Sequence, residues 1–121
     1  MDKKTRSYGF ILDTSMDAIR LSQEEKAYYI SELKKEDTHM FAYIVLYFAH
    51  LYLIARVIDI LEIDDEKMSD YSDVGEETLG DAIMSYNMEE DGPFEIYAFG
   101  KILAALEEVS IHSAPQQVYD L

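Results

Sequence analysis

The stretch MFAYIVLYFAHLYLIARVIDIL, residues 40–61, constrains the fold more than any other part of the chain. Residues 40–55 are apolar except for His50, and Arg56 and Asp59 then interrupt the run. A membrane-spanning helix needs about 20 consecutive apolar residues, and charged residues near its centre are costly in lipid. The sequence that follows is also strongly acidic. These features favour a buried helix of a soluble domain over a membrane span.

On a helical wheel, Tyr43, Tyr47, His50 and Ile54 lie on one face of this helix. The second half of the stretch is amphipathic, whereas the first half is apolar on all sides. A helix that is apolar all round has to be surrounded by other apolar groups. Two arrangements satisfy this requirement: the other helices of the same chain cover it, or a second subunit packs against the face that carries these four residues.

Three further segments have helical patterns. Ser22 and Glu25 form a capping box, which predicts a helix to about residue 36. A second capping box over residues 73–76 predicts a helix to about residue 87, and Pro93 suits the first turn of a last helix. The chain has only 5 Gly and 2 Pro, so few residues interrupt these segments. We expect an all-α fold, a small bundle of about four helices around the central hydrophobic helix.

The length of 121 residues predicts one domain, 1–121. Residues 1–21 form an N-terminal arm, in which Tyr8–Leu12 is either a short strand or an extended piece that packs on the core. The polar composition of residues 113–121 predicts a loose tail. Gly100 is expected to let the last helix approach a neighbouring helix closely. The chain has no Cys, which excludes disulfides and Cys-ligated zinc and fits a cytoplasmic protein.

Negative charge is concentrated in the second part of the chain. The formal net charge is -15, and between Asp59 and Glu95 there are 14 acidic residues against Lys67 alone. Residues 64–73 read as an acidic linker. Direct nucleic-acid binding and anionic membranes are disfavoured, because both need basic residues. A basic protein partner is favoured through long-range electrostatic attraction.

Candidate chemical motifs are incomplete. The segment Asp70–Asp81 partly resembles a calcium loop of the EF-hand type, but Val74 stands where an oxygen ligand belongs. Glu36 and His39 have the spacing of helical di-iron sites, which need two such pairs and two more Glu. His50 is most simply a hydrogen-bonded core residue. We therefore expect no metal, no cofactor and no enzymatic activity.

The acidic segment is the candidate partner-binding site, with Tyr71 as its aromatic anchor. The residues assigned to it are Asp64, Asp65, Glu66, Asp70, Tyr71, Asp73, Glu76 and Glu77. In composition the chain resembles small acidic inhibitors of nucleic-acid enzymes, such as immunity proteins, antitoxins and phage anti-restriction or anti-CRISPR proteins. The resemblance implies a non-enzymatic inhibitor that blocks the nucleic-acid-binding surface of a toxin or a nucleic-acid-processing enzyme. The alternative is a self-associating adaptor or assembly subunit, such as a homodimer, in which the acidic residues serve only solubility.

Overall fold

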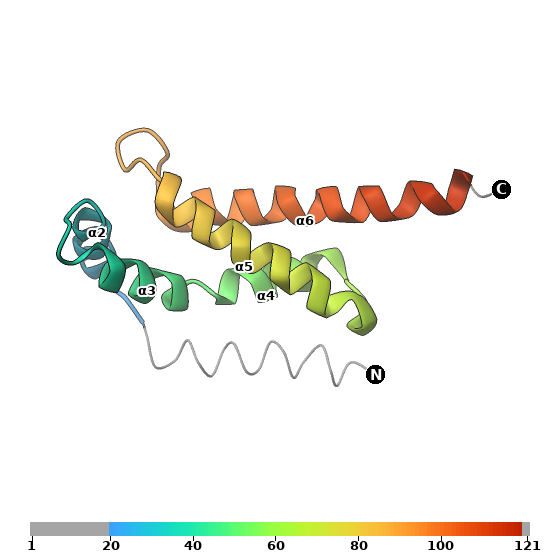
Figure 1. Ribbon diagram of the computed structural model, residues 1–121, viewed down its shortest axis with the longest axis horizontal. Helices are drawn as coiled ribbons and strands as arrows, with labels where there is room; N and C mark the ends of the chain where they lie inside the picture. Colours follow the sequence, from blue (N-terminus) through green and yellow to red (C-terminus); the bar gives the residue numbers. More distant parts are fainter. Residues whose placement is uncertain (1–19, 120–121) are drawn as a thin grey trace.

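The computed structural model describes residues 20–119, with side chains to residue 111, and contains helices and connecting turns but no strand over that range (Figure 1). Its elements are α2 (Gln23–Glu32), α3 (His39–Ala49), α4 (Tyr52–Leu61), the short 3-10 helix η1 (Asp65–Lys67), α5 (Met68–Ser85) and α6 (Phe94–Tyr119). The predicted all-α bundle is confirmed. Most of the predicted N-terminal arm, residues 1–19, lies outside the described residues.

Helix α2 begins at the predicted capping box. The Ser22 hydroxyl accepts a hydrogen bond from the Glu25 amide at 3.1 Å, and the Glu25 carboxylate accepts one from the Ser22 amide at 2.8 Å. Two of the amides that a helix start leaves without partners are satisfied in this way. The capping box therefore fixes where the chain enters the bundle.

The central hydrophobic segment is two helices rather than one. The backbone leaves the helical conformation at His50, with φ -119° and ψ 9°, and α4 starts two residues later. The His50 Nδ1 atom lies 2.8 Å from the Leu46 carbonyl oxygen, and its ring packs edge-on against Phe94 of α6, with centroids 4.7 Å apart. The local hydrogen bond to Leu46 and the tertiary ring contact with Phe94 hold the break in a stretch whose residues would all continue a helix.

Helix α4 forms the centre of the core and packs against α5 and α6 (Figure 1). The largest fully buried side chains come from α3, α4, α5, α6 and the break at His50: Leu46, His50, Ile54, Val57, Ile58, Leu79, Ile83, Ile102 and Leu106. At Gly75 a Cβ atom would lie 2.8 Å from Cγ2 of Ile54, so the glycine permits the close approach of α5 to α4. Gly100 is exposed with no atom within 4 Å of such a Cβ, and its predicted packing role is wrong.

Helix α5 starts at Met68, six residues before the start predicted from the second capping box. Met68, Tyr71, Gly75 and Leu79 are all buried and recur at helical spacing, and this stripe draws the segment onto the core. The predicted linker over 64–73 is therefore mostly helical. A calcium loop over 70–81 is also excluded, because a continuous helix cannot wrap its side chains around one ion.

At the C-terminal end of the chain, α6 extends to Tyr119. The helix thus includes most of residues 113–121, for which the sequence predicts a loose tail.

One stretch of the described chain, His39–Leu61, is long and apolar enough to cross a membrane by length and composition. Half of its most apolar window is buried inside the protein. The stretch is also interrupted at His50. Core helices of soluble proteins meet the same criterion of length and composition, so the measure alone does not assign a location.

Candidate functional site

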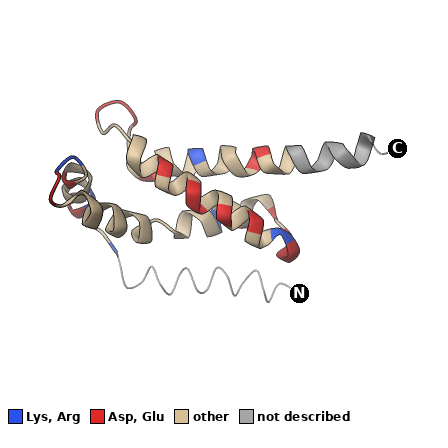
Figure 2. Cartoon of the chain, viewed as in Figure 1, with Lys and Arg blue, Asp and Glu red and all other residues tan. Residues whose placement is uncertain are grey.

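An acidic row runs along the outer face of α5 (Figure 2). It consists of Asp70, Asp73, Glu77 and Asp81, which are all exposed and spaced three or four residues apart. This spacing places successive side chains on one side of a helix, so the row is about 16 Å long. No salt bridge involves any of the four among the described residues. Four carboxylates are thus presented to solvent on one helix.

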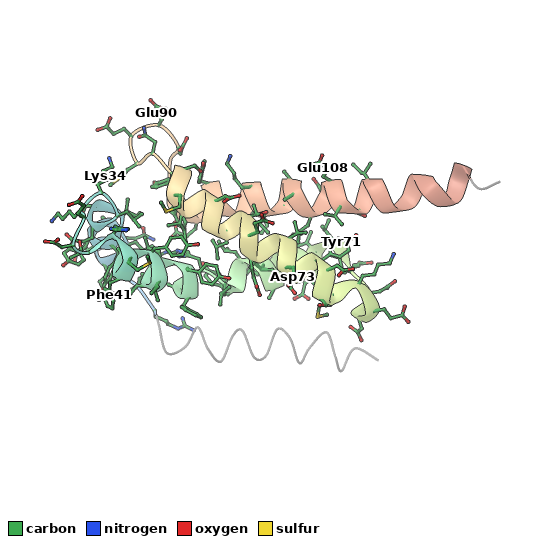
Figure 3. The ribbon with its side chains drawn as sticks, in the orientation of Figure 1. Lys34, Phe41, Tyr71, Asp73, Glu90 and Glu108 are labelled. Atoms are coloured by element: carbon green, nitrogen blue, oxygen red, sulfur yellow. The ribbon has the colours of Figure 1, made fainter. Side chains whose placement is uncertain are left out.

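The structure brings most of the predicted site together, with one correction. Asp64 and Glu66 are exposed and Asp65 is half-buried. Asp65 and Glu66 belong to η1, which leads into the end of α5 where the row begins. Tyr71 is only 5% exposed and belongs to the core, so its predicted role as a surface anchor is wrong (Figure 3). The structure also adds Asp81, because the helix continues the row by one more turn.

The two other tyrosines near the acidic segment are also engaged within the chain. The Tyr86 hydroxyl donates to the Gly92 carbonyl oxygen, and the Tyr97 hydroxyl lies 2.8 Å from the Ser85 Oγ atom. Both rings are half-buried and lie in contact, with centroids 5.4 Å apart. The candidate surface is therefore made of carboxylates without an aromatic anchor.

Glu76 flanks the row on α5 and is half-buried. Burial raises the pKa of the Glu76 carboxyl, and the nearby negative charge of Asp73 raises it further. Like charges three or four residues apart on a helix destabilise it. Among residues 20–111 no ion pair supplies a cation to the row, so a cation from elsewhere would relieve this repulsion.

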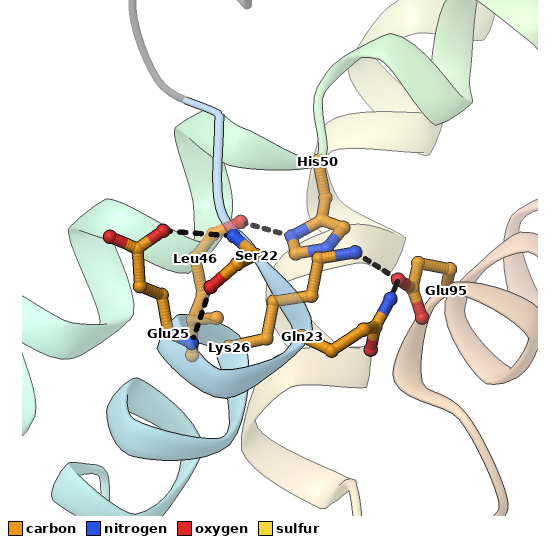
Figure 4. A network of polar contacts seen from close by, with 7 residues as sticks. All are labelled: Ser22, Gln23, Glu25, Lys26, Leu46, His50 and Glu95. Atoms are coloured by element: carbon orange, nitrogen blue, oxygen red, sulfur yellow. Dashed lines mark hydrogen bonds and ion pairs between the residues drawn. The ribbon is translucent and has the colours of Figure 1, made fainter.

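A second polar cluster joins α2, α3 and α6 below the break in the central segment (Figure 4). Lys26 forms an ion pair with Glu95, and Gln23 donates to the same carboxylate oxygen at 3.1 Å. Burial tends to raise the pKa of Glu95, but hydrogen bonds from Lys26, its own amide and Gln23 outweigh burial and lower it to about 2. This cluster fastens α2 to α6.

His50 lies beside that ion pair and is fully buried. Burial lowers its pKa to about 4, with the Lys26 charge acting in the same direction and the Leu46 carbonyl and Glu95 acting against. The imidazole is therefore neutral at neutral pH, with Nδ1 as the donor to Leu46 and Nε2 without a hydrogen-bond partner among the described residues. A buried nitrogen without a partner lowers the free energy of unfolding. The environment of His50 therefore affects the stability of the fold.

The described residues contain no group of three or more His, Asp or Glu side chains arranged to hold a metal ion. His39, of the predicted Glu36–His39 pair, instead places its Nδ1 atom 3.0 Å from the Glu36 carbonyl oxygen.

No protein-family model matches the sequence, and neither curated proteins nor solved structures contain a significant match.

Proposed function

We propose that this protein is a non-enzymatic, cytoplasmic inhibitor that binds the basic, nucleic-acid-facing surface of a partner protein. It would act as immunity proteins, antitoxins and phage anti-defence proteins do, by occupying the place of nucleic-acid phosphates. The observation that carries the proposal is the exposed acidic row on α5, with Asp64 and Glu66 at its start. Carboxylates accept charge-assisted hydrogen bonds from the Arg and Lys side chains that otherwise bind phosphates.

The acidic row lies on a helix, α5, that is packed against the core, and this rigidity favours binding of a partner. The opposite face of α5 is fixed in the core by Tyr71, Leu79 and Ile83, which are at most 5% exposed. The carboxylates therefore stand on a rigid element before a partner arrives. A binding surface that is already ordered loses less conformational entropy on association.

The overall charge supports the same proposal. A net charge of -15 attracts a basic partner over a distance of about one Debye length and raises the association rate. Charge of one sign also destabilises the compact state by self-repulsion. A basic surface that binds the row removes this repulsion, so binding and stability are coupled.

The test compares two variants with equal charge. The neutralised variant removes three carboxylates of the row by Asp70→Asn, Asp73→Asn and Glu77→Gln. The control variant removes three exposed carboxylates far from the row in sequence, by Glu24→Gln, Glu36→Gln and Asp37→Asn. Proteins captured from the source cells by the immobilised chain are purified, and release of labelled duplex DNA or RNA from each is followed by fluorescence anisotropy.

We expect the wild type and the control variant to displace the nucleic acid, and the neutralised variant to need at least about tenfold more protein. Displacement should weaken as salt rises toward about 0.5 M. The proposal is refuted if the neutralised variant competes as well as the wild type, or if partner, nucleic acid and this protein form a ternary complex.

The alternative, a self-associating adaptor, was based on the face with Tyr43, Tyr47, His50 and Ile54. In the structure His50 and Ile54 are 0% exposed, and the Tyr43 hydroxyl meets the α5 backbone at Gly80. Half of this face is thus buried within the chain, which favours the inhibitor over the alternative.

A further inference from the structure

The side of α3 that faces away from the bundle is apolar and uncovered among the described residues. Met40, Phe41, Ile44 and Phe48 are 61%, 62%, 44% and 43% exposed, and Phe41 lies at the edge of the molecule in Figure 3. With about 200 Å² for a whole large side chain, the four together expose about 400 Å². Helix α3 carries no Asp, Glu, Lys or Arg. Contiguous apolar patches of this size commonly mark a contact surface.

The opposite side of α3 is already used. Ala42, Leu46 and Ala49 are at most 7% exposed and face the bundle. The four exposed side chains therefore remain after intramolecular packing of the described residues, and their cover has to come from elsewhere.

We propose that the chain's own segment Tyr8–Leu12 docks on this face of α3. The segment reads YGFIL and carries four large apolar side chains with no charge. The segment lies outside the described residues. Two facts point to it: its apolar sequence, and the short distance along the chain to residue 20, where the described chain begins. Docking would complete the apolar surroundings that α3 needs.

Residues 13–21, which join the segment to α2, form a short tether that starts near the C-terminal end of α3. Ser22 caps α2, and Lys26 in the first turns of α2 pairs with Glu95 next to His50, the residue that ends α3 (Figure 4). Phe48 is two residues from that end. Residues 13–21 reach up to about 30 Å when extended, and the row from Phe41 to Phe48 is only about 10 Å long. Five extended residues span about 16 Å, enough to follow the whole row.

Two magnitudes favour this occupant over a second copy of the chain. A stable interface buries about 800 Å² on each partner, twice what the α3 face offers. A segment joined to its site through a short linker reaches an effective concentration in the millimolar range, about a thousandfold above a second copy at micromolar concentration. Two copies with a net charge of -15 each would also repel one another.

Disulfide trapping tests the proposal cleanly, because the natural chain has no Cys. The full chain with Ile11→Cys and Ile44→Cys is oxidised at low concentration and analysed by non-reducing electrophoresis and by mass spectrometry of the linked peptides. A disulfide needs Cα atoms within about 7 Å, so it reports docking directly. The matched control pairs Ile11→Cys with Ile96→Cys, since Ile96 on α6 is 68% exposed.

We expect an intrachain disulfide in the α3 pair, formed at least about tenfold faster than in the α6 pair. Equal rates in the two pairs, or no disulfide in either, overturn the proposal. Rapid formation of linked dimers by the single Ile44→Cys variant overturns it as well, and assigns the face to a second copy.

An independent measurement uses no Cys. Phe10→Ser in the full chain is expected to raise the fluorescence of an apolar dye that binds exposed hydrophobic surface. The same substitution should add little in a chain that already carries Phe41→Ser, because the two side chains share one contact. Additive effects of the two substitutions contradict the proposed contact.

Discussion

The buried imidazole of His50 should make the protein less stable in mild acid, and the size of the effect follows from its surroundings. The ordinary pKa of 6.5 falls to about 4 in the folded protein, chiefly through burial. Between these values the unfolded chain binds a proton that the folded chain excludes. The contribution of neutral His50 to the unfolding free energy is therefore fully present above about pH 6.5 and is lost progressively as the pH falls toward 4.

The two pKa values give the magnitude. Integrated over the titration, the unfolding free energy should fall by about 2 kcal/mol between about pH 7 and pH 5, and by about 3 kcal/mol in full. Groups that face the ring from other helices act on its pKa in opposite directions: Lys26 lowers it and Glu95 raises it. Glu95, with its pKa lowered to about 2, loses its own contribution below about pH 4.5. The window above pH 5 therefore separates the contribution of His50 from that of Glu95.

The assay is urea unfolding followed by far-UV circular dichroism at about pH 7 and pH 5, for the wild type and for His50→Leu. Leucine keeps an apolar side chain at the site, cannot titrate and removes the unpaired Nε2 atom. We expect the wild type to lose about 2 kcal/mol more than the variant between the two pH values. Glu76, whose pKa is raised, contributes a dependence of the opposite sign, but it is common to both proteins and cancels in the difference.

His39→Gln serves as the matched control, since His39 is exposed and outside the core. It should keep the wild-type dependence on pH. The same dependence in His50→Leu as in the wild type would show that the imidazole is solvated or already paired in solution, and the reasoning from burial would be wrong.

Three further predictions concern stability. Gly75→Ala should lower the unfolding free energy by about 1–3 kcal/mol, because its new methyl group meets a buried isoleucine, whereas Gly100→Ala should raise it by up to about 1 kcal/mol; chemical denaturation measures both. Glu62 ends α4 with φ 53°, so Glu62→Gly should stabilise by about 0.5–1 kcal/mol, and Glu62→Gln, which removes only the charge, should not reproduce that gain. The neutralised variant of the acidic row should have a higher Tm than the wild type at low salt, with a difference that shrinks near about 0.5 M salt in scanning calorimetry.

The sequence predicted the helical class and the start of α2, because both depend on local signals. The hydroxyl of Ser22 and the carboxylate of Glu25 need only each other's amides. The start of α5 was missed for the opposite reason. The acidic residues of 64–73 dominate the local composition, while the stripe of Met68, Tyr71 and Leu79 gains its energy only from contact with other helices.

The break at His50 could not be predicted for the same physical reason. Each residue from 40 to 55 is compatible with a helix, and the break is held by the Leu46 carbonyl oxygen and by Phe94, which lies more than forty positions along the chain. The assignment of Tyr71 to the surface failed because a tyrosine among acidic neighbours has the same local pattern whether its ring faces solvent or the core.

These differences change how the acidic segment should be understood. As a linker, its carboxylates could spread apart and lower their repulsion at little cost. As the outer face of α5, with Tyr71 and Leu79 fixed in the core, they are held at helical spacing and cannot separate. The repulsion is then a constant property of the folded protein. At Glu76, beside the row, burial raises the pKa and the charge of Asp73 adds to that rise. A fold that keeps such a row in register gains stability whenever a complementary basic surface binds, and this coupling is the physical basis for the proposed inhibition.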